Sequence, residues 1–120
     1  MTYNEAFADS AEVEPPIELL GRGHVYHLYV IRLNLERLRI DRKQFVEELR
    51  LRNIGVSVHF IPVHLHPFYR ERFGYGCGDL RHSEALYDRI VSLPIYPRMT
   101  ECDVQDVIAA VSDVACTFKR

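Results

Sequence analysis

The C-terminal part of this 120-residue chain carries its clearest amphipathic pattern. Thr100 is a residue type that caps helices, and apolar residues follow it at helical spacing. The apolar stripe consists of Val104, Val107, Ile108, Val111 and Ala115. A helix with one apolar stripe has to bury it against a second layer of structure. The second layer must come from the segments of the chain that favour strands.

Three segments predict strands. His24–Leu33 is rich in β-branched and aromatic residues on both alternating faces, which predicts a strand buried on both sides. Val56–Phe60 alternates as a second short strand and is closed by Pro62. Leu93–Pro97 predicts a short extended piece that its prolines limit to an edge or an end of the sheet.

Helices are predicted between these segments. Asp41 and Gln44 form a capping-box pattern at the start of a helix from Arg42 to Arg52, which Asn53-Ile54-Gly55 ends. Residues 61–74 predict a turn and a short helix, and Ser83–Ser92 predicts a further helix. The order of elements indicates an α+β fold, with helices packed on a small antiparallel sheet.

The length suits a single domain with one hydrophobic core. Residues 1–22 are acidic and interrupted by Pro15-Pro16 and Gly21-Arg22-Gly23, so we interpret them as a connector from a domain that precedes this one. Residues 23–120 are then the folded domain.

The net charge and the cysteines indicate which binding partners and which cellular compartment suit this chain. Fifteen basic and 17 acidic residues give a net charge of −2, which disfavours binding to nucleic acid. No apolar run approaches membrane-spanning length. Cys77, Cys102 and Cys116 form an odd set without a CxxC pair, which is typical of reduced thiols in the cytoplasm.

Three histidines are the main candidates for chemistry. His59, His64 and His66 lie within one predicted strand and its following turn. Their spacing is not diagnostic of a metal site, and no carboxylate or cysteine falls nearby to complete four ligands. A metal site, histidines packed at a turn and histidines that line a ligand site therefore all stay open. Neither a GxSxG nucleophile elbow nor a phosphate-binding glycine loop is present.

Four blocks of the sequence resemble the C-terminal part of the DegT/DnrJ/StrS sugar aminotransferases. The most specific are Gly55–Tyr69, with its histidines and prolines, and Ser92–Pro97, which reads SLPIYP. His24–Val30 and the residues from Met99 to Ile108 supply the other two, in matching order. The resemblance implies the small domain of a fold-type I aminotransferase that depends on pyridoxal phosphate.

Enzymes of this family move an amino group onto a keto group of a nucleotide-linked sugar. In them pyridoxal phosphate is held by a lysine Schiff base in a large domain, which this chain lacks. This chain has only two lysines, Lys43 and Lys119. Neither sits in the family's cofactor segment, so the resemblance implies that the chain is inactive alone and binds no cofactor covalently. The resemblance implies that His59, Phe60 and His64 line the substrate at the mouth of the active site.

Two other functions stay open at this point. The chain could be a free-standing regulatory or interaction module derived from such a domain, because a fold does not determine a function. It could also be a small metal protein that uses its histidines.

We predict that the isolated chain forms no aldimine with pyridoxal phosphate. Borohydride reduction followed by mass spectrometry should find Lys43 and Lys119 unmodified. A stoichiometric adduct on either lysine would contradict the prediction.

We also predict that the isolated chain self-associates through an apolar face that a large domain would otherwise cover. The candidate residues are Tyr26, Tyr29, Phe60, Phe68 and Tyr69. Sedimentation over a concentration series should show association, whereas a strict monomer at high concentration would count against it.

Overall fold

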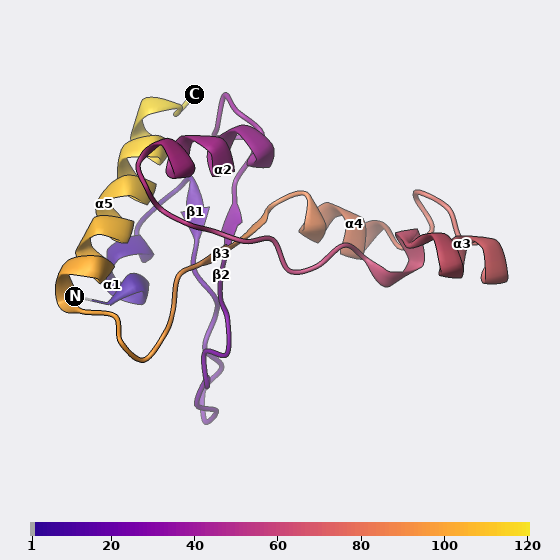
Figure 1. The fold of residues 1–120 in the computed structure, drawn as a ribbon, viewed down its shortest axis with the longest axis horizontal. Helices are drawn as coiled ribbons and strands as arrows, with labels where there is room; N and C mark the ends of the chain where they lie inside the picture. The colour runs from indigo at the N-terminus through magenta and orange to yellow at the C-terminus, as the bar shows by residue number, and fades with distance from the viewer. Residues whose placement is uncertain (1) are drawn as a thin grey trace.

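A computed structural model describes residues 2–120. Three strands and three helices form the body of the molecule, and three further helical segments project from it (Figure 1). The body contains α1 (Tyr3–Phe7), β1 (Val13–Glu14), β2 (Tyr29–Leu33), α2 (Arg42–Leu51), β3 (Ile90–Leu93) and α5 (Glu101–Thr117). The projecting part contains the 3-10 helix η1 (Val63–Leu65), α3 (Pro67–Phe73) and α4 (Arg81–Tyr87).

The sheet has the strand order β1-β2-β3 and is antiparallel throughout, which confirms the predicted fold class. Strand β2 pairs with β3 from Tyr29 opposite Leu93 to Arg32 opposite Ile90. Strand β1 adds a short pairing on the other edge, with Val13 opposite Leu33.

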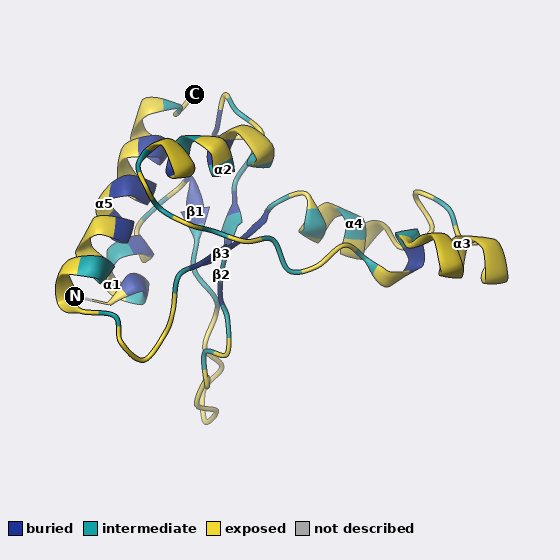
Figure 2. Ribbon diagram, in the orientation of Figure 1, coloured by how far each residue is buried: buried dark blue, intermediate teal, exposed yellow. Residues whose placement is uncertain are grey.

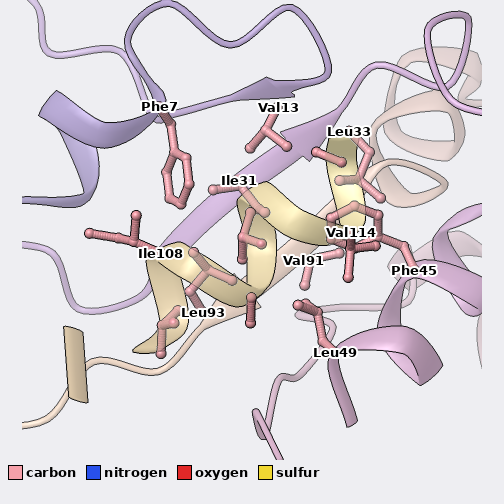
Figure 3. Packing of buried hydrophobic residues seen from close by; sticks show 14 of the residues in the cluster. Phe7, Val13, Ile31, Leu33, Phe45, Leu49, Val91, Leu93, Ile108 and Val114 are labelled. Atoms are coloured by element: carbon pink, nitrogen blue, oxygen red, sulfur yellow. The ribbon is translucent and has the colours of Figure 1, made fainter. Parts of the chain in front are cut away.

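The hydrophobic core lies between this sheet and the helices α2 and α5 (Figure 3). Sheet residues such as Ile31 and Val91 are fully buried, and Phe45 of α2 and Val114 of α5 meet them. All four residues of β3 are buried, whereas burial alternates along β2. Strand β2 is thus fully covered on only one face, which corrects the prediction that both faces are buried.

Capping residues recognisable in the sequence set the ends of the two main helices, α2 and α5. The Asp41 carboxylate accepts a hydrogen bond from the Gln44 backbone N–H at 2.8 Å, and the Gln44 side chain accepts one from the Asp41 N–H at 3.1 Å. Thr100 and Asp103 form the same capping box at the start of α5. Asn53, with φ of 61°, provides the left-handed turn after α2. The predicted starts of α2 and α5 are therefore confirmed, and α2 ends at Leu51, one residue before the predicted Arg52.

The predicted strand from His24 to Leu33 is wrong in its first half. β2 begins only at Tyr29, and Val25 is exposed. The pairing stops because β3 ends at Leu93 and is followed by Pro94, which has no backbone N–H to continue the ladder. A β-prone run without a partner strand stays irregular.

The segment Val56–Phe60 was predicted as a strand and forms only one bridge. Ser57 and Ser92 exchange two backbone hydrogen bonds, of 2.8 and 3.2 Å, and no longer pairing follows. The predicted helix from Ser83 to Ser92 is also wrong at its end, because α4 stops at Tyr87 and Ile90–Leu93 becomes β3. A short apolar run fits either a buried helix or a buried strand, and here the pairing with β2 decides.

The first 22 residues contribute to the same core as the rest. Tyr3 and Phe7 of α1 and Val13 of β1 are buried against it. Burial raises the pKa of the Tyr3 hydroxyl to about 12, and this hydroxyl donates to the Pro94 carbonyl at 3.0 Å. The division between a connector and a domain at residues 22 and 23 stays a prediction.

Residues 60–88, which we call the arm, extend away from the body on the side opposite α5 (Figure 1). Neither α3 nor α4 contains a buried residue, and Figure 2 shows the arm almost entirely exposed or half-buried. The radius of gyration is 15.7 Å, larger than the roughly 14 Å expected for a compact domain of this length. The arm accounts for this extended shape.

No helix within residues 2–120 is both long and apolar enough to cross a membrane.

Truncation of Phe45 should test the core. Because Phe45 is fully buried between the sheet and α5, Phe45→Ala should lower the free energy of unfolding by about 3–5 kcal/mol. Leu51 lies on the same helix but is exposed, so Leu51→Ala should change it by less than about 0.5 kcal/mol. Urea denaturation of both variants provides the comparison, and equal effects would contradict the described core.

Candidate functional site

His59 is anchored to the edge of the sheet. Its Nδ1 lies 2.9 Å from the Oγ of Ser92, which is a buried residue of β3. No residue in the described range 2–120 forms a hydrogen bond with the other ring nitrogen, Nε2. The contact with Ser92 fixes the ring and leaves Nε2 available for a ligand.

Phe60 follows directly and is 72% exposed. The rings of His59 and Phe60 lie edge to face, with centroids 4.6 Å apart. The two residues together form a small aromatic surface where the arm leaves the body. Two hollows of the described chain, of about 520 and 480 Å³, are lined by other residues. His59 is half-buried and Phe60 is exposed, so enclosing a ligand on these two residues would need a second wall.

His64 is buried within the arm. It is 3% exposed, and its Nε2 lies 2.8 Å from Oε1 of Glu84. This contact joins η1 to α4 across 20 residues of sequence. His64 is the only buried residue in the three helical segments of the arm. Its Nε2 is committed within the chain, so the contact gives His64 a positioning role in the arm.

The Glu84 carboxylate accepts hydrogen bonds from further donors. The Gly78 backbone N–H lies 2.9 Å from both carboxylate oxygens, and the Cys77 thiol donates to Oε2 at 3.2 Å. The hydrogen bond from His64, followed by those from Gly78 and Cys77, lowers the pKa of Glu84 to about 2. The same carboxylate raises the pKa of the Cys77 thiol. We call this group, His64, Cys77, Gly78 and Glu84, the Glu84 clasp.

Glu84 falls in the first turn of the helix that the sequence predicts from Ser83 to Ser92. Its link to His64 was missed because the two residues are far apart in sequence and belong to different elements. No local pattern indicates such a contact. A glutamate close after a glycine-rich loop was the only available signal.

The histidines do not converge on a common point. His59 contacts Ser92, His64 contacts Glu84, and His66 is exposed. Within residues 2–120, no group of three or more His, Cys, Asp or Glu side chains is arranged to hold a metal ion. The three cysteines are free and exposed. The hypothesis of a histidine-based metal protein gains no support from this arrangement.

The two lysines do not fit the role of a Schiff-base residue. Lys119 lies near the end of the chain, where its Nζ contacts the buried Glu12 carboxylate at 2.7 Å. Lys43 is exposed in the first turn of α2, beside the capping residues. That this chain binds no pyridoxal phosphate covalently stays a prediction.

Comparison with known proteins identifies the family. Residues 1–112 match the DegT/DnrJ/EryC1/StrS aminotransferase family. The chain belongs to this family. The resemblance noted in the sequence is thereby confirmed.

Two curated relatives illustrate the match. A protein of Methanocaldococcus jannaschii, MJ1066, described as uncharacterized, is 50% identical over 112 residues. The spore coat polysaccharide biosynthesis protein SpsC of Bacillus subtilis is 45% identical over 113 residues. Each match covers 93% of this chain and 29% of the relative. The chain thus spans less than a third of the length of these family members.

Solved structures agree on the fold. PseC of Helicobacter pylori, an aminotransferase involved in the biosynthesis of pseudoaminic acid, matches with a TM-score of 0.85 at 26% identity, over 97% of this chain and 30% of that one. DesV of S. venezuelae, solved in complex with a ketimine intermediate, matches with a TM-score of 0.82 at 28% identity, over 94% of this chain and 29% of that one. The match includes nearly the whole chain, and therefore the arm as well as the body.

The Glu84 clasp should titrate at low pH. Glu84 has a lowered pKa in the folded chain, so its contribution to the order of the arm is complete above its ordinary value of 4.5 and is lost as the pH falls toward about 2. The amide resonance of Gly78, followed by NMR, should therefore shift with a midpoint well below 4.5. In Glu84→Gln the same resonance should show no such step. A midpoint near 4.5 in the parent chain would contradict the clasp.

Proposed function

We propose that this chain is the small domain of a pyridoxal-phosphate-dependent aminotransferase that acts on nucleotide-linked keto sugars, and that it is inactive alone. The family match carries this proposal, together with the 29% of each relative that the chain spans. The name of SpsC supports a role in polysaccharide biosynthesis, and that of PseC supports an aminotransferase role in a biosynthetic pathway. We place the enzyme in the cytoplasm, where its free cysteines would stay reduced.

His59 and Phe60 are the residues that we assign to the substrate. With Nδ1 held by Ser92, the imidazole can direct Nε2 at a phosphate or carboxylate oxygen of the substrate or amino donor. Phe60 offers an exposed apolar surface beside it. Because Phe60 is exposed and His59 only half-buried, the remaining part of the enzyme would supply the opposite wall of the site.

His64 would act on the substrate indirectly. Its contact with Glu84 joins η1 to α4 and so fixes the turn that follows Phe60. Loss of this contact would let the aromatic surface move relative to the sheet. We therefore propose that His64 positions the site, in place of the direct contact with substrate that the resemblance implied.

The cofactor belongs to the remaining part of the enzyme. Pyridoxal phosphate would serve there as the electron sink for the amino transfer. Neither Lys43 nor Lys119 is placed to form the Schiff base, so this lysine would come from outside the 120 residues.

An intact-length chimera tests the proposal, with this chain replacing the matching 29% of Bacillus subtilis SpsC. His59→Ala should lower kcat/KM for the sugar or the amino donor about tenfold or more, because a charge-assisted hydrogen bond contributes roughly 1.5–3 kcal/mol. His66→Ala is the matched control, since His66 is exposed in the same segment. Equal constants for the two variants would show that His59 is structural and that the site assignment is wrong.

A further inference from the structure

Large exposed apolar side chains lie mainly on the arm and on the segment before β2, where the exposed ones are aliphatic: Ile17, Leu19, Leu20 and Val25. The arm exposes aromatic and aliphatic residues along its whole length, whereas α2 exposes only Leu51 and α5 exposes none. The strongest cluster lies on and just after α3. It consists of Phe68, Tyr69, Phe73 and Tyr75, which we call the aromatic patch.

The rings of the aromatic patch contact one another and not the body. Tyr69 and Phe73, one helical turn apart, are stacked with centroids 6.0 Å apart. Phe73 also approaches Phe68 at 6.5 Å and Tyr75 at 6.4 Å. With about 200 Å² for each whole side chain, their exposed fractions leave roughly 400 Å² of aromatic surface open. This is about half of what one partner buries in a stable protein interface.

Two arginines lie among these rings. Arg70 and Arg72 of α3 are exposed, and neither forms an ion pair within residues 2–120. Aromatic residues and arginine are the types that dominate the binding energy of protein interfaces. The partner surface should therefore be apolar at its centre and acidic at its rim.

The arm has little internal packing of its own. Besides the clasp around Glu84, α3 and α4 bury no side chain of their own. Even so, nearly the whole chain superimposes on PseC and DesV, proteins in which it corresponds to only 29–30% of the length. A segment with so little internal packing keeps one conformation most readily when another part of the protein holds it.

We infer that the aromatic patch is the surface on which the arm docks against the remaining part of the same aminotransferase chain, in a groove with an acidic rim. This inference rests on the proposed function and deepens it. Docking there would also bring His59 and Phe60, at the root of the arm, against the second wall that their site lacks.

The isolated chain supplies the first test. Because the aromatic patch takes no part in the core, the double variant Phe68→Gln/Phe73→Gln should unfold at the same temperature as the parent chain, within about 1 °C, at a concentration at which sedimentation shows both to be monomeric. The exposed Leu51 gives the matched control, Leu51→Gln. A clear loss of stability in the double variant alone would show that these rings support their own domain, and would overturn the inference.

The chimera with SpsC supplies the second test, with thermal unfolding as the readout. The unsubstituted chimera should unfold in one transition, and the Phe68→Gln/Phe73→Gln chimera should lose about 5 °C or more or show a separate early transition. The Leu51→Gln chimera should match the unsubstituted one. Two separate transitions in the unsubstituted chimera, or an arm variant that matches Leu51→Gln, would overturn the inference.

Dilution distinguishes docking within one chain from docking on a second copy. A contact within the chain predicts that the loss caused by the double substitution is the same over a hundredfold range of concentration. A loss that changes with dilution would assign the patch to a second copy and overturn the inference. Unfolding does not measure amino transfer, so an inactive chimera with the expected melting pattern would reject the proposed function and leave the docking surface standing.

Discussion

The pairing of β2 with β3 is the contact on which the rest of the structure depends. Four residue pairs, from Tyr29–Leu93 to Arg32–Ile90, join the N-terminal and C-terminal halves of the chain. The buried side chains of both strands then form the surface on which α2 and α5 pack. Every other feature attaches to this unit. The Oγ that orients His59 belongs to Ser92 in β3. The arm begins next to His59 and ends just before β3, so both of its ends lie at this strand.

The body and the arm differ in where their apolar side chains lie. The body encloses a core of its own, with α2 and α5 as its polar exterior. The arm is held internally by little more than the His64–Glu84 contact and displays its aromatic residues to the outside. The candidate substrate residues lie at the boundary between these two parts. Family membership explains the combination, because the chain corresponds to less than a third of the relatives that it matches.

Local signals in the sequence predicted the helices well. The capping boxes at Asp41 and Thr100 and the apolar stripe of α5 depend on residues a few positions apart, so they can be recognised without knowing the fold. Strand boundaries depend on a partner far away in sequence. The run from His24 looks like a strand, but pairing stops at Tyr29 because Pro94 ends the partner strand. The sequence Ile90–Ser92 is compatible with both a helix and a strand, and only its pairing with β2 makes it a strand.

The candidate site was predictable to a similar extent. The sequence identified the segment rich in histidine and proline, but it did not show that His59 and His64 have different environments. His59 and His64 look equivalent in the sequence, whereas one faces the boundary of the arm and the other is buried on Glu84. Tyr29 was expected on an exposed apolar face and lies in the core instead, while Phe60, Phe68 and Tyr69 are indeed exposed. These distinctions depend on tertiary contacts between residues 20 or more positions apart.

Hydrogen exchange measured on the isolated chain tests most directly whether the body is self-supporting and the arm is not. Backbone amides of β2, β3, α2 and α5 should exchange only on opening of the whole core. Those of α3 and α4 should exchange at least a hundredfold faster, because they can open locally without exposing buried side chains. If α3 proves as strongly protected as α5 in the monomeric chain, the arm has its own support, and this account of the molecule is contradicted.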